Sequence, residues 1–329
     1  MTGFGESHGS AIGAVIDGCP AGIHLTLGHI NHALQRRRPG QSPLTSARAE
    51  TDEAEILSGV FEDRTLGTPI AVLVRNTDAR SEDYTRDRYR IGHADRSWEM
   101  KYGHRDYRGG GRSSGRETVA RVIGGAVAER ILPADLRITG FARQIGHIAA
   151  VHVPEELTRE VVDRYPTRCP DAAADVAITE ELLRLREQGD SVGGIVELRI
   201  DNVPAGLGEP VFHKLESALA AAVMSIGAIS GVAMGDAFTE ALMPGSAYHQ
   251  ALPGREEGIA LRSHGIQGGI STGAPVILRC AVKPTSTIGS MAREGRHDPC
   301  IIPRIIPVIE SMAALVLADH WLLARMDRI

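Results

Sequence analysis

Apolar positions recur with helical spacing in four long stretches of this chain, and shorter strand-like blocks lie between them. The four helical stretches are residues 27–37, 116–132, 209–225 and 308–325. The strand-like blocks are residues 11–17, 55–61, 68–74, 136–146, 194–200, 229–234 and 274–282. Helices as apolar as these need cover on more than one side. The pattern therefore predicts an α+β protein in which a layer of long helices lies between antiparallel sheets.

The two halves of the chain resemble each other in sequence. I-L-S-G-V at residues 56–60 resembles A-I-S-G-V at 228–232, and G-T-P-I-A-V-L at 67–73 resembles G-A-P-V-I-L at 273–278. Each half runs through a helix, two strands, a basic glycine-containing loop and a long helix. Because the loop lengths differ between the halves, we treat duplication as a hypothesis.

We interpret residues 1–329 as a single domain with pseudo-duplicated halves at about 1–145 and 190–329. Residues 150–190 are more charged and poorer in glycine than the rest, and a short helix is predicted there at 180–187. We interpret 150–190 as a peripheral insertion.

The composition is that of an ordinary soluble globular protein, with 43% hydrophobic and 23% charged residues. The net charge of −5 argues against general nucleic-acid binding. No uninterrupted apolar run reaches the roughly 18 residues of a membrane span, and the polar start predicts no signal peptide. The cysteines, at positions 19, 169, 280 and 300, form no C-x-x-C pair. We therefore expect a cytoplasmic protein with reduced thiols, no metal, and no membrane or nucleic-acid partner.

Residues 89–122 concentrate the basic and glycine-rich features of the chain. Their arginines include Arg90, Arg105, Arg108, Arg112 and Arg116. Gly109 to Gly111 let backbone N–H groups approach a ligand where a Cβ would obstruct them. Ser113 or Ser114 can cap a helix that begins near Arg116. Such a loop beside arginines suits phosphate or carboxylate; the alternative is a flexible surface loop with solvated arginines.

Two shorter motifs carry further candidate chemistry. His8 lies among glycines in G-F-G-E-S-H-G, so it can project from an unusual turn into a pocket, although a lone loop histidine can equally be solvated. Arg36, Arg37 and Arg38 end the first predicted helix before Pro39, where cations suit the helix dipole. The arginine triplet is therefore either a solvated helix end or a ligand contact.

A series of motifs in a fixed order resembles one enzyme family over essentially the whole chain. The motifs are G-E-S-H-G at 5–9, R-R-R-P-G at 36–40, G-H-A-D at 92–95, R-D-Y-R-G-G-G-R-S-S-G-R-E-T at 105–118 and P-A-G-L-G-E-P at 204–210, followed by G-G-I-S-T-G, K-P-T-S-T and G-R-H-D-P-C. Together they resemble chorismate synthase, and the series is far more specific than a single glycine loop.

The resemblance implies an FMN-dependent lyase of the shikimate pathway. The family converts 5-enolpyruvylshikimate 3-phosphate to chorismate and phosphate by 1,4-anti elimination, and it requires reduced FMN although there is no net redox change. The resemblance also implies a βαβ sandwich, with long helices between two antiparallel sheets, assembled as a homotetramer. Because the sequence has no G-x-G-x-x-G dinucleotide fingerprint, we expect an external flavin reductant.

By motif match, the resemblance assigns roles to particular residues. The catalytic residues would be His8 for proton supply to the departing phosphate, His93 for proton exchange with the flavin, and Asp298 for removal of the ring proton. The substrate-binding residues would be Arg37, Arg90, Ser114, Arg116 and Arg296. The FMN-binding residues would be Arg112, Ser113, Ser114, Gly227, Ala228, Gly268, Lys283, Pro284, Thr285, Ser286, Thr287 and Arg296. Taken alone, Asp298 could instead cap the last helix.

The chain departs from the family's usual motifs at several points. Ile91 replaces a proline before G-H-A-D, His104 replaces a non-titrating residue, and Pro43 stands where an arginine is usual. Loops 264–269 and 286–296 look shortened, and no strand is expected before G-E-S-H-G. These departures leave open a non-catalytic homologue that binds FMN or an anionic metabolite. A P-loop enzyme is disfavoured because G-x-x-x-x-G-K-[ST] is absent.

Overall fold

Two antiparallel sheets frame the computed structural model, which describes residues 1–41, 44–45, 50–78, 86–87, 89–248, 264–289, 292 and 298–327. The first has the order β1-β2-β6-β3, formed by Thr2–Phe4, Ala11–Ile16, Ile70–Arg75 and Ala54–Ser58. The second has the order β10-β13-β9-β7-β8, formed by Ile229–Met234, Val276–Val282, Gly194–Asp201, Arg137–Ile145 and Ile148–Ala149. The short pairs are β4 (Val60–Phe61) with β5 (Arg64–Thr65), and β11 (Ile266–Gln267) with β12 (Ile270–Ser271).

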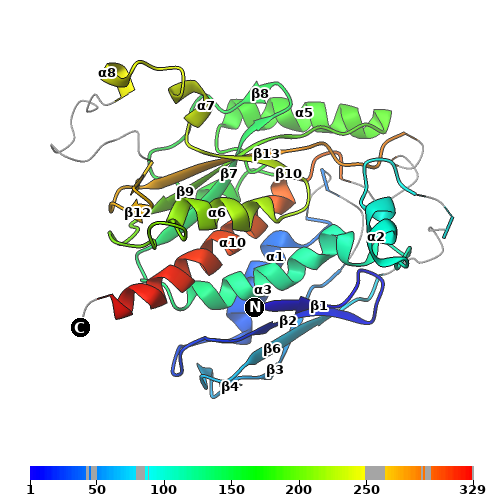
Figure 1. Ribbon diagram of the computed structural model, residues 1–329. Helices are drawn as coiled ribbons and strands as arrows, with labels where there is room; N and C mark the ends of the chain where they lie inside the picture. Colours follow the sequence, from blue (N-terminus) through cyan, green and yellow to red (C-terminus); the bar gives the residue numbers. More distant parts are fainter. Residues whose placement is uncertain are drawn as a thin grey trace.

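Four helices lie between these sheets (Figure 1). They are α1 (Leu27–Arg37), α3 (Thr118–Glu129), α6 (Leu215–Met224) and α10 (Ile302–Leu323). α1 and α3 pack on the first sheet, α6 and α10 pack on the second, and α10 also contacts the other three helices. α3 and α10 approach closely at Gly125, where a Cβ would lie only 2.5 Å from the Cα of Ser311. The predicted α+β class is confirmed.

The remaining helices are short or lie outside the central layer. They are α2 (Asp95–Tyr102), α4 (Arg159–Val162), α5 (Ala172–Gln188), α7 (Ala237–Glu240), α8 (Gly245–Tyr248) and the 3-10 turns η2 (Gly111–Ser113), η3 (Gly115–Glu117) and η5 (Ala324–Met326). The short helix predicted at 180–187 is wrong in length, because α5 spans 17 residues. Its buried stripe of Ala174, Ile178, Leu182 and Leu185 is thin, and charged side chains between those positions obscured it in the sequence.

Two predicted helix starts are also wrong. α6 begins at Leu215 rather than 209, because Glu209 and His213 pair with each other in a tight bridge. α10 begins at Ile302, well before the predicted start at 308. Pro303 fits its first turn, where backbone N–H groups need no partner inside the helix. Pro307 has no N–H to bond the carbonyl of Pro303, and Nη1 of Arg168 donates to that carbonyl instead.

The N-terminal segment forms a strand, so the expectation of no strand before G-E-S-H-G is wrong. β1 runs antiparallel to β2, with Thr2 opposite Val15 and Phe4 opposite Gly13. A strand of only three residues pairs on one side, and its polar Thr2 and small Gly3 gave no apolar signal. β1 therefore leads directly into the loop that carries His8.

Among the described residues, the segment Ile302–Met326 has the length and apolar character of a membrane span. Of its most apolar 18-residue stretch, 67% is buried inside the protein. This segment is not one uninterrupted apolar run, because Arg304 and Glu310 interrupt its apolar pattern. In this fold the helix is the centre of the core, between α3 and the second sheet.

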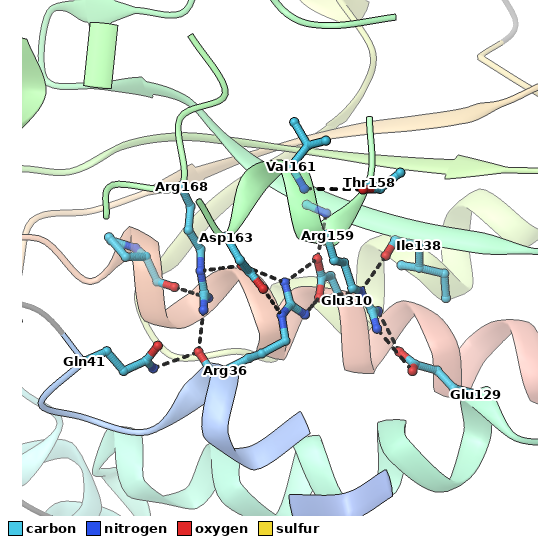
Figure 2. Close-up of polar contacts among 12 residues, drawn as sticks. Arg36, Gln41, Glu129, Ile138, Thr158, Arg159, Val161, Asp163, Arg168 and Glu310 are labelled. Carbon is cyan, nitrogen blue, oxygen red and sulfur yellow. Dashed lines mark hydrogen bonds and ion pairs between the residues drawn. The ribbon is translucent and has the colours of Figure 1, made fainter. Parts of the chain in front are cut away.

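A partly buried ionic cluster joins residues 159–168 to the central helices, as Figure 2 shows. Its members are Arg36, Glu129, Arg159, Asp163, Arg168 and Glu310. Glu310 is 1% exposed and takes charge-assisted contacts from Arg36 and Arg159 and the N–H of Gly140 at 2.8 Å. Burial acts to raise the pKa of Glu310, but the two arginines outweigh it and lower the pKa below its ordinary value.

Candidate functional site

The G-E-S-H-G loop connects β1 to β2 and is held by a side chain from β6's end. The side-chain amide of Asn76 donates to the carbonyl of Glu6 at 3.0 Å and to that of Gly9 at 2.8 Å. These two carbonyls lie on either side of His8 in the chain. The amide oxygen of Asn76 accepts from Nε of Arg116 at 3.0 Å. Asn76 therefore ties the His8 loop to the start of α3.

The three consecutive glycines pack between the two candidate histidines. Gly109, Gly110 and Gly111 have φ values of +62°, +84° and +52°, which favour glycine. A Cβ at Gly109 would lie 2.3 Å from the ring of His8. A Cβ at Gly110 would lie 2.8 Å from the ring of His93 and 2.5 Å from Nη2 of Arg90. The loop thus places both histidines near the N-terminus of α3. A side chain at Gly109 or Gly110 would clash with their rings.

Arg90, His93 and Asp95 form one polar cluster at the start of α2. Arg90 donates to Asp95 from Nε at 2.9 Å, from Nη2 at 2.8 Å and from its backbone N–H at 3.1 Å. His93 Nδ1 lies 2.9 Å from Asp95 Oδ1 and 3.0 Å from Arg90 Nη2. Burial, followed by the charge of Arg90, lowers the pKa of His93. Burial would raise the pKa of Asp95, but the hydrogen bonds from Arg90 outweigh it and lower the pKa strongly.

The end of β13 lies against this cluster. Ser286 Oγ donates to the carbonyl of Gly92 at 2.7 Å, and Lys283 Nζ donates to the same carbonyl at 3.2 Å. The backbone N–H of Lys283 donates to the carbonyl of Ala228 at 2.9 Å. The predicted cofactor residues of β13 and of the turn before β10 therefore lie at one sheet end, beside the loop of His93.

Arg37 and Arg116 converge on Asp52, a residue that the sequence analysis did not identify. Arg37 Nη1 lies 3.3 Å from Asp52 Oδ2, and Arg116 Nη1 pairs with Asp52 Oδ1. The two arginines are only 2% and 4% exposed. Burial, together with neighbouring Arg304 and Arg116, lowers the pKa of Arg37 to about 9. Burial opposes ionisation of Asp52, but Arg37 and Arg116 outweigh it and lower its pKa.

Asp298 precedes α10 and pairs with an arginine of that helix. Arg304 Nη1 contacts Asp298 Oδ2, while Thr285 Oγ1 donates to the backbone carbonyl of Asp298 at 3.0 Å. The N-cap of α10 is Ile301, without a side-chain cap. The alternative of Asp298 as a helix cap is therefore wrong. Arg304 is close enough to Arg37 to influence its pKa, so the Asp298 pair adjoins the Asp52 cluster.

The other predicted residues have mixed placements. Arg112 Nη1 donates to the carbonyl of Gly5 at 3.0 Å, and Ser113 Oγ donates to that of Gly110 at 2.7 Å. Ser114 caps the turn before α3 by accepting from the N–H of Arg116 at 3.3 Å. Gly268 lies apart, in the β11–β12 turn that packs near the start of α6, whereas Gly227 follows the end of that helix. Arg296 and Pro43 lie outside the described residues.

Sequence reasoning missed four polar residues, Asp52, Asn76, Asp95 and Arg304. Asp95 lies inside the G-H-A-D motif, where its carboxylate next to a histidine was an available signal. Asp52 and Asn76 lie in polar segments with no motif of their own, and their contacts to Arg116 span 64 and 40 positions.

Comparisons with known proteins agree on one family. The family model described as chorismate synthase matches residues 1–322. The chain is 47% identical to the chorismate synthase of Bdellovibrio bacteriovorus over 338 residues, covering 100% of this chain and 97% of the relative. It is 48% identical to that of Roseiflexus castenholzii over 351 residues, covering 100% and 97%. A crystal structure of a chorismate synthase superimposes with a TM-score of 0.77 and 33% identity, covering 98% of this chain and 91% of the other.

Proposed function

This chain belongs to the chorismate synthase family, and we propose that it converts 5-enolpyruvylshikimate 3-phosphate to chorismate and phosphate with reduced FMN. In this 1,4-anti elimination the bond between a ring carbon and the phosphate oxygen breaks, a ring proton leaves, and one new carbon–carbon double bond forms. One observation supports the proposal most strongly: the loop of Gly109 and Gly110 packs against both His8 and His93. His8 and His93 are thereby both held near the arginine-rich loop that precedes α3.

The family implies a flavin cofactor, and the residues present fit FMN. Lys283 is exposed at the end of β13, and a Cβ at Gly227 would meet no atom within 4 Å, so this edge offers a cation and open space. Lys283 and Ser286, with Arg112 and Ser113 of the glycine loop, would hold the phosphate and the ring polar atoms. Reduced FMN, when bound, supplies electron density and a ring nitrogen that exchanges a proton.

The protein groups then have separate tasks. His8 would donate a proton to the departing phosphate, and His93 would hold the proton that a bound flavin exchanges. Asp298, which pairs with Arg304, is proposed as the acceptor for the ring proton. Arg90, Arg116, Arg37, Ser114 and Arg296 are proposed to bind the phosphate and two carboxylates of the substrate. Asp52 already pairs with Arg37 and Arg116 in this structure, so an anionic substrate would share these two guanidinium groups with that carboxylate.

A turnover assay tests the function and separates it from the binding-only alternative. The protein is mixed anaerobically with substrate and chemically reduced FMN, and chorismate and phosphate are quantified. Equal amounts of both products support the lyase, and flavin binding without product supports a non-catalytic homologue. A parallel reaction with oxidised FMN and NADPH tests the proposed need for an external reductant. If the reaction with oxidised FMN and NADPH is as fast as the reaction with chemically reduced FMN, the protein does not need an external reductant.

The finer architectural and cellular predictions belong to the same proposal. We propose that the two sheets and the helices between them form the family's βαβ sandwich, with halves at about 1–145 and 190–329 and an insertion at 150–190. We also propose a cytoplasmic homotetramer. Family membership supports both, and light scattering coupled to size-exclusion chromatography measures the assembly.

A further inference from the structure

We propose that Asp95 is a positioning residue that fixes the ring nitrogen which His93 presents for proton exchange, and this inference rests on the function proposed above. The carboxylate is 3% exposed at the first position of α2, and it is held independently of His93. Three donors of Arg90, namely the backbone N–H, Nε and Nη2, fix both of its oxygens. Asp95 is therefore a rigid reference against which the imidazole orients.

The geometry around Nδ1 of His93 selects one tautomer. Nδ1, Asp95 Oδ1 and Arg90 Nη2 form a nearly equilateral triangle with sides of 2.8, 2.9 and 3.0 Å. Nη2 carries two hydrogens that diverge widely, whereas Oδ1 and Nδ1 lie close together as seen from Nη2 in this triangle. With one hydrogen directed at Oδ1, as the paired Nε and Nη2 contacts require, the other is poorly aligned with Nδ1. Oδ1 is an ionised oxygen that can accept more than one hydrogen bond. The arrangement that satisfies all three atoms places the proton of neutral His93 on Nδ1, donated to Oδ1.

This tautomer determines what His93 can do. With Nδ1 committed to Asp95, Nε2 carries a lone pair and is the atom available to accept a proton. Among the residues that the structure describes, the charged groups that face His93 are Asp95 and Arg90 from its own segment and Lys283, which follows β13. Within that set, loss of the Asp95 carboxylate would leave only cations around the ring. Nδ1 would then become the acceptor for Arg90, and Nε2 would hold the proton.

The ring nitrogens of His93 report the tautomer directly. Protein labelled with ¹⁵N-histidine is studied by NMR without flavin or substrate, above the pH at which His93 titrates, and the His93 signals are those that vanish in His93→Gln. We expect Nδ1 to be protonated in the wild type. In Asp95→Asn and Asp95→Ala the ratio of the Nδ1–H to the Nε2–H tautomer should fall by about tenfold or more, the effect of one charge-assisted hydrogen bond.

A matched control separates this effect from general disturbance of α2. Glu99 is on the same helix and pairs with Arg105 at 2.8 Å, away from His93. Glu99→Gln should leave the His93 tautomer unchanged and turnover within about twofold, while Asp95→Asn should lose turnover on the scale of a missing proton-transfer group, about 10²–10⁴-fold.

The outcomes distinguish this inference from the proposed function. A proton on Nε2 in the wild type overturns the inference even if both Asp95 variants fail to fold. An unchanged tautomer in folded variants also overturns it, whatever their turnover. If the wild type makes no chorismate but the tautomer shifts as expected, the proposed function fails while the positioning of His93 by Asp95 stands.

Discussion

Replacement of Asn76 by aspartate tests whether the His8 loop must be held for turnover. The substitution keeps the size and shape of the side chain but removes both amide hydrogens. The carbonyls of Glu6 and Gly9, at 3.0 and 2.8 Å, would then face a carboxylate oxygen instead of a donor. The contact to Nε of Arg116 would remain, because either side chain offers it an oxygen. The change therefore acts on one side of Asn76 only.

The expected size follows from these contacts. Two hydrogen bonds at about 1 kcal/mol each give a loss of about 2 kcal/mol in the free energy of unfolding. The new carboxylate gains little from Arg116, which already pairs with Asp52. The loop on either side of His8 would move away from the repelled oxygen. A displacement of about 1 Å in a catalytic group costs on the order of 10²-fold in rate, so we expect that loss in kcat.

Two measurements and one control decide the matter. Urea unfolding measures the stability change, and chorismate formation with reduced FMN measures kcat. Asn202→Asp is the matched control, because the Asn202 amide donates at 2.8 Å to the carbonyl of Asp135 on the exposed surface. That variant should keep kcat and lose less than about 1 kcal/mol. If Asn76→Asp is destabilised as calculated but keeps kcat within about threefold of wild type, Asn76 stabilises the fold without positioning His8.

Three further predictions concern the proposed proton-transfer groups and the buried carboxylates. His8→Ala and His93→Ala should each lose about 10²–10⁴-fold in kcat while FMN binding, followed by flavin fluorescence, survives; full activity in either variant removes that histidine from the mechanism. Asp298→Asn should bind FMN and substrate but turn over slowly, because an amide cannot accept the proton; near-normal kcat would make Asp298 structural. Asp52 and Glu310 have lowered folded-state pKa values, whereas unfolded carboxyls titrate near pH 4, so their stabilisation should be complete above about pH 5 and be lost as the pH falls through the folded values. In urea unfolding at several pH values, Asp52→Asn should reduce the loss of stability at acid pH. An unchanged loss would contradict the lowered pKa of Asp52.

Local sequence signals predicted the parts of the fold that depend on local chemistry. α1 ends at Arg37, just before Pro39, as the sequence pattern predicted. Ser114 accepts the N–H of Arg116 at the glycine loop, as a cap there requires. The start of α10 could not be predicted this way, because its Pro307 is tolerated through Arg168, a residue far away in the chain.

The site shows the same division. The motifs identified the histidines and arginines, because these residue types carry recognisable chemistry at fixed spacing. The partners of those residues were not predictable. Asn76 contacts Glu6 across 70 positions, and Asp52 contacts Arg116 across 64, so no local period or motif records either pairing. Arg37 and Arg116, which the motifs assign to substrate binding, are buried around Asp52, a carboxylate of the chain itself.

The bond from Arg168 to the Pro303 carbonyl makes two distant substitutions interdependent. If Pro307 is replaced by alanine, the backbone N–H of residue 307 can bond the Pro303 carbonyl. Arg168 then competes with that N–H for the same carbonyl oxygen. Conversely, a chain that loses Arg168 while keeping Pro307 strands a buried carbonyl and leaves Asp163 with one cation fewer. Relatives should therefore inherit this arginine and this proline as a pair, and a shortened 150–190 segment would require a concerted change inside α10.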